Sequence, residues 1–299
     1  MDKNNGAIYD ARKLGKPKMI ILGVQHMFAM FGATVLVPFL FNVNPTTCLF
    51  MNGIGTLLYL FLTKGKIPSY LGSSFAFISP VMVILSTSSY SDAQSGFIVF
   101  GLIFILFSLI IKYTGTGWID IIFPPACMGA IIAVIGLELA PTAAGMAGLT
   151  GDVIDFRNIA VSMFTLAVTI IGSVAFKGFM AIIPILFGVI CGYIFSFFMG
   201  LVDLAPVAAA PWFQMPHFYQ PTFNLNAILI IAPAALVVLA EHIGHLVVTG
   251  NVVERNLIKD PGLARSLFAD GCSNVLSGFF GATPVSYTHL RAHETSAHL

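Results

Sequence analysis

Residues 226–249 read NAILIIAPAALVVLAEHIGHLVVT, a stretch that is long and apolar enough to cross a membrane as one helix. The hydrocarbon core of a bilayer takes roughly 20 helical residues. Over all 299 residues the chain is 57% hydrophobic and only 9% charged, and its mean hydropathy is +0.91. A single soluble core could not bury so much apolar surface. The sequence therefore predicts an all-α polytopic membrane protein that lies in a lipid bilayer.

The same length criterion predicts about nine transmembrane helices. Lys and Arg collect in the loops that a cytoplasmic N-terminus would place inside, and before the tail the outer loops hold only Arg157. No cleavable signal peptide is visible, so residues 1–18 are predicted to be a cytoplasmic tail. The nine predicted spans are residues 19–41, 48–62, 68–85, 96–112, 118–139, 158–176, 178–202, 226–249 and 264–281.

Composition also argues against several classes of partner and site. A net charge of +1 spread along the chain is unlike the concentrated basic face that binds nucleic acid. The cysteines lie in or beside apolar runs without the spacing of a disulfide framework or a zinc site. We predict no metal and no cofactor. The cysteines are Cys48, Cys127, Cys191 and Cys272.

A faint internal repeat connects the two ends of the chain. Gln25-His26 in the first predicted span matches Glu241-His242 in the eighth, and Asn52-Gly53 in the second matches Asp270-Gly271 in the ninth. An odd number of spans separates the copies, so the second copy would enter the membrane from the opposite side. Such matches also arise by chance in apolar sequence. If the repeat is real, the third span has a partner that starts near residue 285.

Glu241 is the strongest candidate for a functional residue. A charged group at the bilayer centre costs about 2.5–3.5 kcal/mol on insertion scales, so an acid there usually has a task or a partner. His245 lies one turn further along the same predicted helix face. A carboxylate and an imidazole on one face can share a proton, which suits a proton-coupled carrier. The alternative is a pair that only satisfies itself between helices.

Other polar residues in the spans have weaker claims. His242 points away from Glu241 on a helical wheel and is predicted to be a hydrogen-bonding packing residue. Asp270, near the start of the ninth span, is predicted to cap or to pair. Gln25 and His26 are predicted to line or brace the site.

Residues 68–80, PSYLGSSFAFISP, do not resemble a plain spanning helix, because prolines, a glycine and serines surround two phenylalanines. An interrupted segment is tolerated at membrane depth where it lines a cavity, and its free N–H groups can then face a ligand carbonyl. Phe75, next to Ser74, could stack on a planar ring or only pack. With Glu241 this chemistry predicts a small, flat, mostly neutral ligand such as a pyrimidine or purine.

Several ordered blocks resemble the nucleobase-ascorbate transporter (nucleobase:cation symporter) family, and within it the bacterial uracil permeases. The resemblance runs from about Leu22 to Pro284. The blocks are GVQH at 23–26, GATVLVP at 32–38, GKIP at 65–68, GSSFAF at 72–77, FPP at 123–125, GLEL at 136–139 and AEHIGH at 240–245.

The resemblance implies fourteen spans in two inverted repeats of seven, of which this chain holds the first seven and two more. It implies a core domain (residues 19–112 and 226–284), a gate domain (113–202) and an external crossover loop (203–225). It also implies proton symport of uracil or a related nucleobase across the bacterial inner membrane, and a possible homodimer.

The family's site is transferred residue by residue. Uracil would sit between short strands of the third and tenth spans. Glu241 would accept a uracil N–H, and Phe75 with Ser74 would supply ring and backbone contacts. His245 would support proton coupling through Glu241.

From residue 285 the sequence VSYTHLRAHETSAHL departs from the family pattern and has no apolar periodicity. We expect residues 285–299 to be a sequencing or assembly artefact rather than a metal-binding tail. A chain that ended there would be a non-transporting membrane fragment. An intramembrane metalloenzyme is the other alternative, but Glu241 precedes both His242 and His245, whereas metalloprotease helices place Glu between the two histidines.

Overall fold

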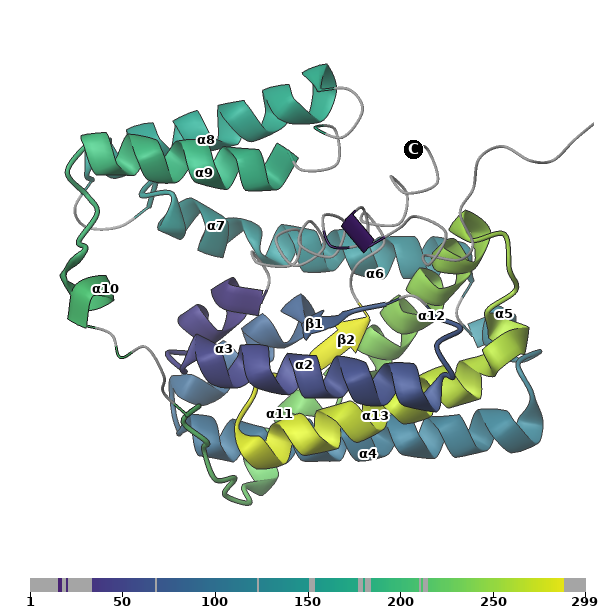
Figure 1. Cartoon of the computed structure of the whole chain (residues 1–299). Coiled ribbons are helices and arrows are strands. Elements are labelled where there is room, and N and C mark those ends of the chain that lie inside the picture. Colours follow the sequence, from purple (N-terminus) through teal and green to yellow (C-terminus); the bar gives the residue numbers. More distant parts are fainter. Residues whose placement is uncertain are drawn as a thin grey trace, which may run out of the picture. The chain divides into compact units, whose positions relative to one another are not determined.

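The computed structural model describes residues 16–17, 20, 34–67, 69–122, 124–150, 154–176, 180, 184–209, 211 and 215–287. Within these ranges the protein consists of helices and one small two-stranded sheet (Figure 1). Five helical stretches in the described part are long and apolar enough to cross a membrane, which agrees with the predicted helical, multi-pass class. They are Pro45–Leu62, Tyr90–Thr114, Gly129–Met146, Phe156–Ala175 and Leu225–Asn251.

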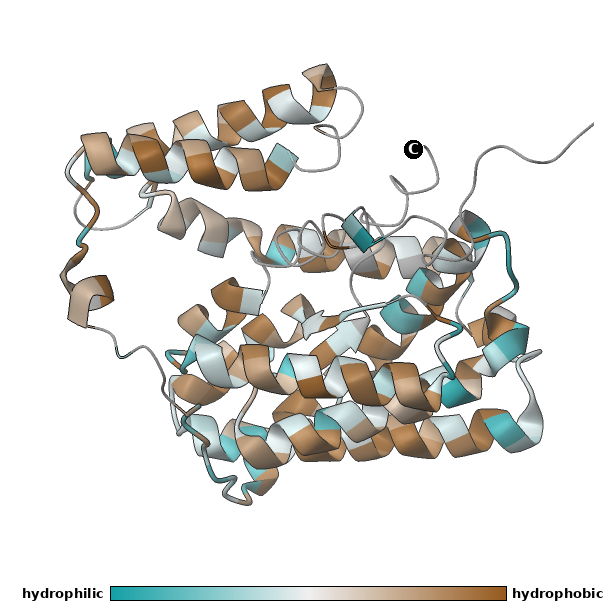
Figure 2. Ribbon diagram, viewed as in Figure 1, coloured by the Kyte–Doolittle hydropathy of each residue, from teal (hydrophilic) through white to brown (hydrophobic). Residues whose placement is uncertain are grey.

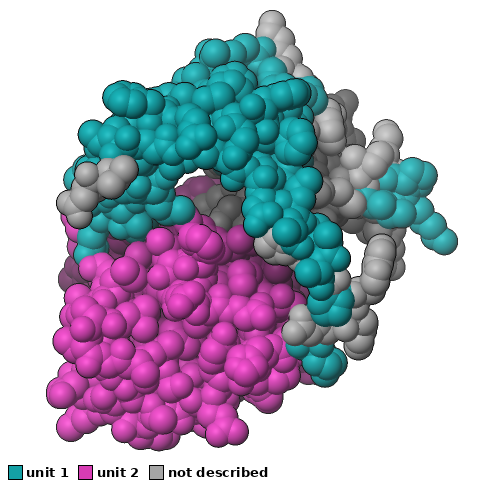
Figure 3. Space-filling model, turned by 90° about the vertical axis from the view of Figure 1, so that its left-hand side faces the viewer, with its two compact units in different colours: residues 1–29, 136–215, 294–299 teal, residues 30–135, 216–293 magenta. Residues whose placement is uncertain are grey.

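The chain forms two compact units, coloured separately in Figure 3. Unit 1 comprises residues 1–29, 136–215 and 294–299, and unit 2 comprises residues 30–135 and 216–293. Residues 113–135, which the sequence analysis assigns to the gate domain, thus group with unit 2.

Unit 1 contains a helical hairpin of α8 (Phe156–Ala175) and α9 (Pro184–Phe198), together with the short helices α7 (Ala140–Met146) and α10 (Ala205–Ala209). Gly188 and Gly192 of α9 lie directly against Thr169 and Thr165 of α8, so the two helices approach closely. Hydrophobic residues dominate both helices (Figure 2), as expected for helices that face lipid.

Prolines divide two of the predicted spans. The span predicted at residues 118–139 is not one helix, because α5 (Ile119–Ile122) and α6 (Pro125–Glu138) flank Pro124. The span predicted at residues 226–249 consists of α11 (Leu225–Ile231) and α12 (Ala234–Val252), with Pro233 at the junction. Proline lacks an N–H donor and restricts the residue before it, so a helix readily ends or bends there.

The interruption predicted in the third span is present. Leu71–Ser73 form strand β1, Phe75–Phe77 form the 3₁₀ helix η2, and Ile78–Leu85 form α3. Phe77 is fully buried against Phe100, with 4.7 Å between the ring centroids, whereas Phe75 is half-buried.

The core of unit 2 lies among α2 (Pro45–Leu62), α4 (Tyr90–Thr114) and α13 (Leu263–Phe280). The helices α2 and α13 are each 18 residues long. Ser273 Oγ of α13 donates to the carbonyl oxygen of Gly55 in α2 at 3.1 Å, and these residues are 218 positions apart. The same separation relates Asn52 to Asp270, one of the two matches in the suggested internal repeat.

Strand β2 (Val285–Tyr287) pairs antiparallel with β1, so that Ser73 lies opposite Val285 and Leu71 opposite Tyr287. The sequence analysis expects residues 285–299 to be an artefact and predicts no strand at residues 285–287. A strand of three residues carries no periodicity that a sequence could reveal. The remainder of that segment lies outside the described residues.

The C-terminal part of the predicted crossover loop is fastened to unit 2. Gln94 Nε2 of α4 donates to the carbonyl oxygen of Tyr219 at 3.0 Å, and the Asn44 N–H donates to the Tyr219 hydroxyl at 3.1 Å. Thr222 Oγ1 donates to Asp92 Oδ1 at 2.5 Å. The segment after residue 215 thus lies across the first turns of α2 and α4.

Candidate functional site

The interrupted third span, β2 and α12 converge within unit 2. Helix α12 contacts both η2 and β2. The Ser74 N–H donates to the Pro284 carbonyl oxygen at 3.0 Å, and the Ser73 and Thr283 hydroxyls are 2.8 Å apart. The two strands are thereby joined at the point where β1 passes into η2. Non-helical backbone is placed beside the helix that carries Glu241, the arrangement typical of a midplane binding site.

Glu241 lies in the middle of α12 and is half-buried. Its Oε2 atom is buried and accepts no hydrogen bond from any residue that the structure describes. An unsatisfied buried acceptor costs about 1–3 kcal/mol, and more when it is charged. This carboxylate oxygen therefore suits an N–H donor brought by a ligand. His245 lies one turn further along α12, with its Nδ1 atom buried.

Ser74 and Phe75 begin the turn into η2. Ser74 is fully buried, and among the described residues its hydroxyl has no hydrogen-bond partner. Phe75 is the first residue of the 3₁₀ helix, whose initial N–H groups have no intrahelical acceptor. Its half-buried ring is available for contact, unlike that of Phe77. Gln25 and His26, the predicted bracing residues, lie outside the described residues.

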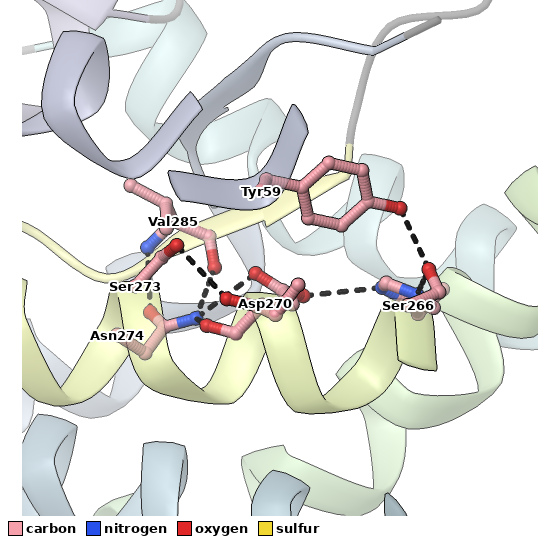
Figure 4. A network of polar contacts seen from close by, with 8 residues as sticks. Tyr59, Ser266, Asp270, Ser273, Asn274 and Val285 are labelled. Atoms are coloured by element: carbon pink, nitrogen blue, oxygen red, sulfur yellow. Dashed lines mark hydrogen bonds and ion pairs between the residues drawn. The ribbon is translucent and has the colours of Figure 1, made fainter. Parts of the chain in front are cut away.

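A buried polar chain runs beside this site from α2 to β2 (Figure 4). His242 lies between Asp270 (Nδ1 to Oδ2, 3.1 Å) and Ser266 (Nε2 to Oγ, 2.7 Å). The Ser266 hydroxyl is 2.6 Å from that of Tyr59, and Asn274 Nδ2 donates to Asp270 Oδ1 at 3.1 Å. The predictions that His242 is a hydrogen-bonding packing residue and that Asp270 pairs are confirmed.

Sequence reasoning missed Tyr59, Ser266 and Asn274. One signal was present, because Ser266, Asp270 and Asn274 recur every fourth residue and so share one face of the ninth span. A polar stripe in a membrane helix indicates contact with protein rather than lipid.

A separate depression of about 370 Å³ surrounds the C-terminal end of α12. Its lining residues all fall between Leu246 and Ile258, and they include neither Glu241 nor Phe75. One continuous segment, where α12 turns toward η4 (Ile258–Gly262), forms this depression. It does not belong to the candidate site.

The fold and site define a multi-pass helical membrane protein whose interrupted span and buried acid resemble a carrier site. The model of the Permease family (Xan_ur_permease) matches residues 17–289, and the chain belongs to this family. The family resemblance found from the sequence blocks is thereby confirmed, and the similar proteins are named permeases rather than enzymes.

Curated relatives share high identity with the chain. It is 62% identical over 268 residues to "Uracil permease" of Escherichia coli (strain K12), covering 89% of this chain and 62% of that protein. It is 58% identical over 271 residues to "Uracil permease" of Paenibacillus larvae subsp. larvae, covering 89% and 64%. To "Uracil permease" of Bacillus subtilis (strain 168) it is 42% identical over 278 residues, covering 89% and 64%. The chain thus spans under two thirds of the length of these relatives.

Proposed function

We propose that the complete protein imports uracil, or a closely related nucleobase, by proton symport across the bacterial inner membrane. The observation that carries the proposal is the buried Glu241 Oε2 atom without a described donor, on the helix that contacts the interrupted third span. The names of the relatives support uracil as the substrate.

The ligand chemistry follows from the groups around the site. Glu241 accepts a ring N–H of uracil, and a charge-assisted bond of this kind is roughly twice as strong as a neutral one. The free N–H groups at the start of η2 donate to a ring carbonyl, and the Ser74 hydroxyl offers a further polar contact. The half-buried ring of Phe75 covers one face of the base.

His245 couples this site to protons in the proposal. It lies on the same face of α12 as Glu241, so a proton can pass between the imidazole and the carboxyl group as the ligand binds and leaves. Gln25 and His26 brace the site from the first span.

The proposed architecture has an N-terminus in the cytoplasm and about nine spans, namely a first repeat of seven and the start of an inverted second repeat. The contact of Ser273 with Gly55 at the repeat offset supports such a two-fold relation. Residues 19–112 and 226–284 form the core domain and residues 113–202 the gate domain, and the complete protein is a homodimer.

Uptake of radiolabelled uracil tests the substrate. Cells that lack their own uracil uptake and express the full-length protein are expected to take up uracil saturably. An excess of unlabelled uracil should compete, and parallel competitions with xanthine, uric acid, thymine and cytosine would define the substrate. Absence of saturable uptake, with the protein shown to be inserted in the membrane, would contradict the proposal.

The proton gradient is tested in the same cells. Each 100 mV of membrane potential is worth about 2.3 kcal/mol per charge, or roughly 50-fold accumulation for one coupled proton. A protonophore is therefore expected to reduce internal uracil to the external concentration, and His245→Ala to have the same effect while purified protein still binds uracil. Accumulation that survives the protonophore would argue against symport.

A further inference from the structure

We propose that Asn274 is a positioning residue for the nucleobase site, because its side chain holds β2 in place, and that the chain Asp270–His242–Ser266–Tyr59 fixes the orientation of its amide. This inference rests on the proposed function, since it concerns how one wall of that site is held.

The contacts of Asn274 with β2 resemble those of a neighbouring strand. Asn274 Nδ2 donates to the Val285 carbonyl oxygen at 2.9 Å, and the Val285 N–H donates to Asn274 Oδ1 at 2.8 Å. Both residues are fully buried. One side-chain amide thus satisfies both backbone polar groups of a strand residue, at a depth where water cannot replace it. Figure 4 shows Asn274 on α13 reaching toward Val285.

The other partners of the amide determine which way it points. Asn274 Nδ2 also donates to Asp270 Oδ1 at 3.1 Å and to the Asp270 carbonyl oxygen at 3.0 Å. A carboxylate only accepts hydrogen bonds, so the NH₂ group must face Asp270 and the carbonyl oxygen must face the Val285 N–H. The reversed amide would place two acceptors together.

Asp270 is itself held by hydrogen bonds from two other helices, directly from α12 and, through Ser266, from α2. Its Oδ2 atom is 3.1 Å from His242 Nδ1 of α12, and His242 Nε2 is 2.7 Å from the Ser266 hydroxyl. With His242 neutral and Nδ1–H donating to the carboxylate, Nε2 accepts from Ser266, and the Ser266 oxygen accepts from the Tyr59 hydroxyl at 2.6 Å. Every donor in this series of hydrogen bonds, from Tyr59 through Ser266 and His242 to Asp270, has an acceptor. A fully satisfied buried network fixes a single geometry.

The network acts on the site through β2. The carbonyl oxygen of Pro284, the residue before β2, accepts a hydrogen bond from the Ser74 N–H at the start of η2. Ser73 pairs with Val285 in the two-stranded ribbon formed by β1 and β2. Displacement of Val285 would therefore move Ser74 and Phe75 relative to Glu241. His242 also follows Glu241 directly on α12, so the same chain ties the acid-bearing helix to α13.

The test measures uracil binding by purified full-length protein and amide hydrogen exchange in peptides that cover residues 71–73 and 285–287. Asn274→Ala leaves both polar groups of Val285 unsatisfied, and it is expected to weaken uracil binding about tenfold or more. Asn274→Asp is expected to do the same, because it loses the donor to Val285 and sets two carboxyl groups side by side. In both variants exchange in the two ribbon peptides should accelerate.

Two further comparisons separate positioning from general stability. Ser273→Ala removes a buried hydroxyl of α13 that bonds to Gly55 and Ala269 but not to β2, so uracil affinity and ribbon exchange should match the wild type. Asp270→Asn keeps an acceptor for the Asn274 amide, and its NH₂ group can donate to His242 Nδ1 once His242 takes the tautomer in which Nε2–H donates to Ser266. This variant should therefore bind uracil nearly as the wild type does. Asp270→Ala should behave like Asn274→Ala.

Normal uracil affinity or unchanged ribbon exchange in Asn274→Ala would overturn the inference. If that variant does not fold, equal losses in Asp270→Asn and Asp270→Ala would overturn it instead. Failure of the wild-type protein to bind uracil would defeat the proposed function, while the exchange data would still decide whether Asn274 holds β2.

Discussion

Full-length protein that carries Glu241→Gln is expected to bind uracil roughly a hundredfold more weakly than the wild type and to show no accumulation in cells. A hydrogen bond to a charged group contributes about 1.5–3 kcal/mol, and 1.4 kcal/mol corresponds to a factor of ten in affinity. Glutamine has nearly the same shape, but it replaces an acceptor-only carboxylate with a group that also carries two N–H donors. The Oε2 position, which accepts no hydrogen bond from the described residues, could then present a donor to the ring N–H of the ligand.

The control is the same substitution at Glu254, an exposed acid just beyond the end of α12. Glu254→Gln should bind uracil with unchanged affinity and transport it normally. Equilibrium binding in detergent and uptake in cells measure the two effects separately. Affinity within about twofold of the wild type in Glu241→Gln would remove the carboxylate from the binding mechanism, since even one neutral hydrogen bond is worth more.

The sequence was informative wherever composition or a single helix carried the signal. Apolar runs predicted the multi-pass helical class, and the crowding of Pro, Gly and Ser at residues 68–80 predicted the break that appears as β1, η2 and α3. Glu241 stood out because an acid is rare in such an apolar helix. These features depend on neighbours within a few residues, which a pattern can reveal.

The remainder depends on contacts between distant segments. Tyr59 and Ser266 are 207 positions apart, and no local pattern links a hydroxyl in one span to a serine in another. Strand β2 exists through its pairing with β1 and its hydrogen bonds to Asn274, and three residues are too few to show a strand period of their own. The break at Pro124 was missed because the apolar run continues on both sides of it.

The second large effect is expected at Gly271, where α13 crosses α4. A Cβ atom on Gly271 would lie 2.7 Å from the Gly101 carbonyl oxygen and 3.0 Å from the Ile105 nitrogen. A Cβ on Gly101 would likewise lie 2.7 Å from the Gly271 carbonyl oxygen. Backbone atoms on both sides cannot rotate away as a side chain could, so even one methyl group forces the helices apart. In a membrane, helices associate largely through such close packing, because lipid is as apolar as their side chains.

Gly271→Val is therefore expected to destabilise the protein by about 3 kcal/mol or more, at the upper end of overpacking effects. That is a large part of a typical free energy of unfolding of about 5–15 kcal/mol. Thermal unfolding in detergent, followed by the loss of monodisperse protein, measures the change. Gly53→Ala is the matched control, because a Cβ there meets nothing within 4 Å. Alanine also favours a helix interior by about 1 kcal/mol over glycine, so Gly53→Ala should be neutral or stabilising.

Gly271 also connects packing to the proposed site. It lies next to Asp270 and one turn before Asn274, so separation of α13 from α4 would shift the residues that hold β2. Gly271→Ala, the milder change, is then expected to weaken uracil binding as well as stability. Gly278 lies at the other end of the contact between α13 and α4, away from Asp270, and its Cβ would meet Ile98 at 2.7 Å. Gly278→Ala is therefore expected to lower stability but to leave uracil affinity unchanged. A loss of stability in Gly271→Ala with wild-type uracil affinity would mean that α13 moves without carrying β2 with it.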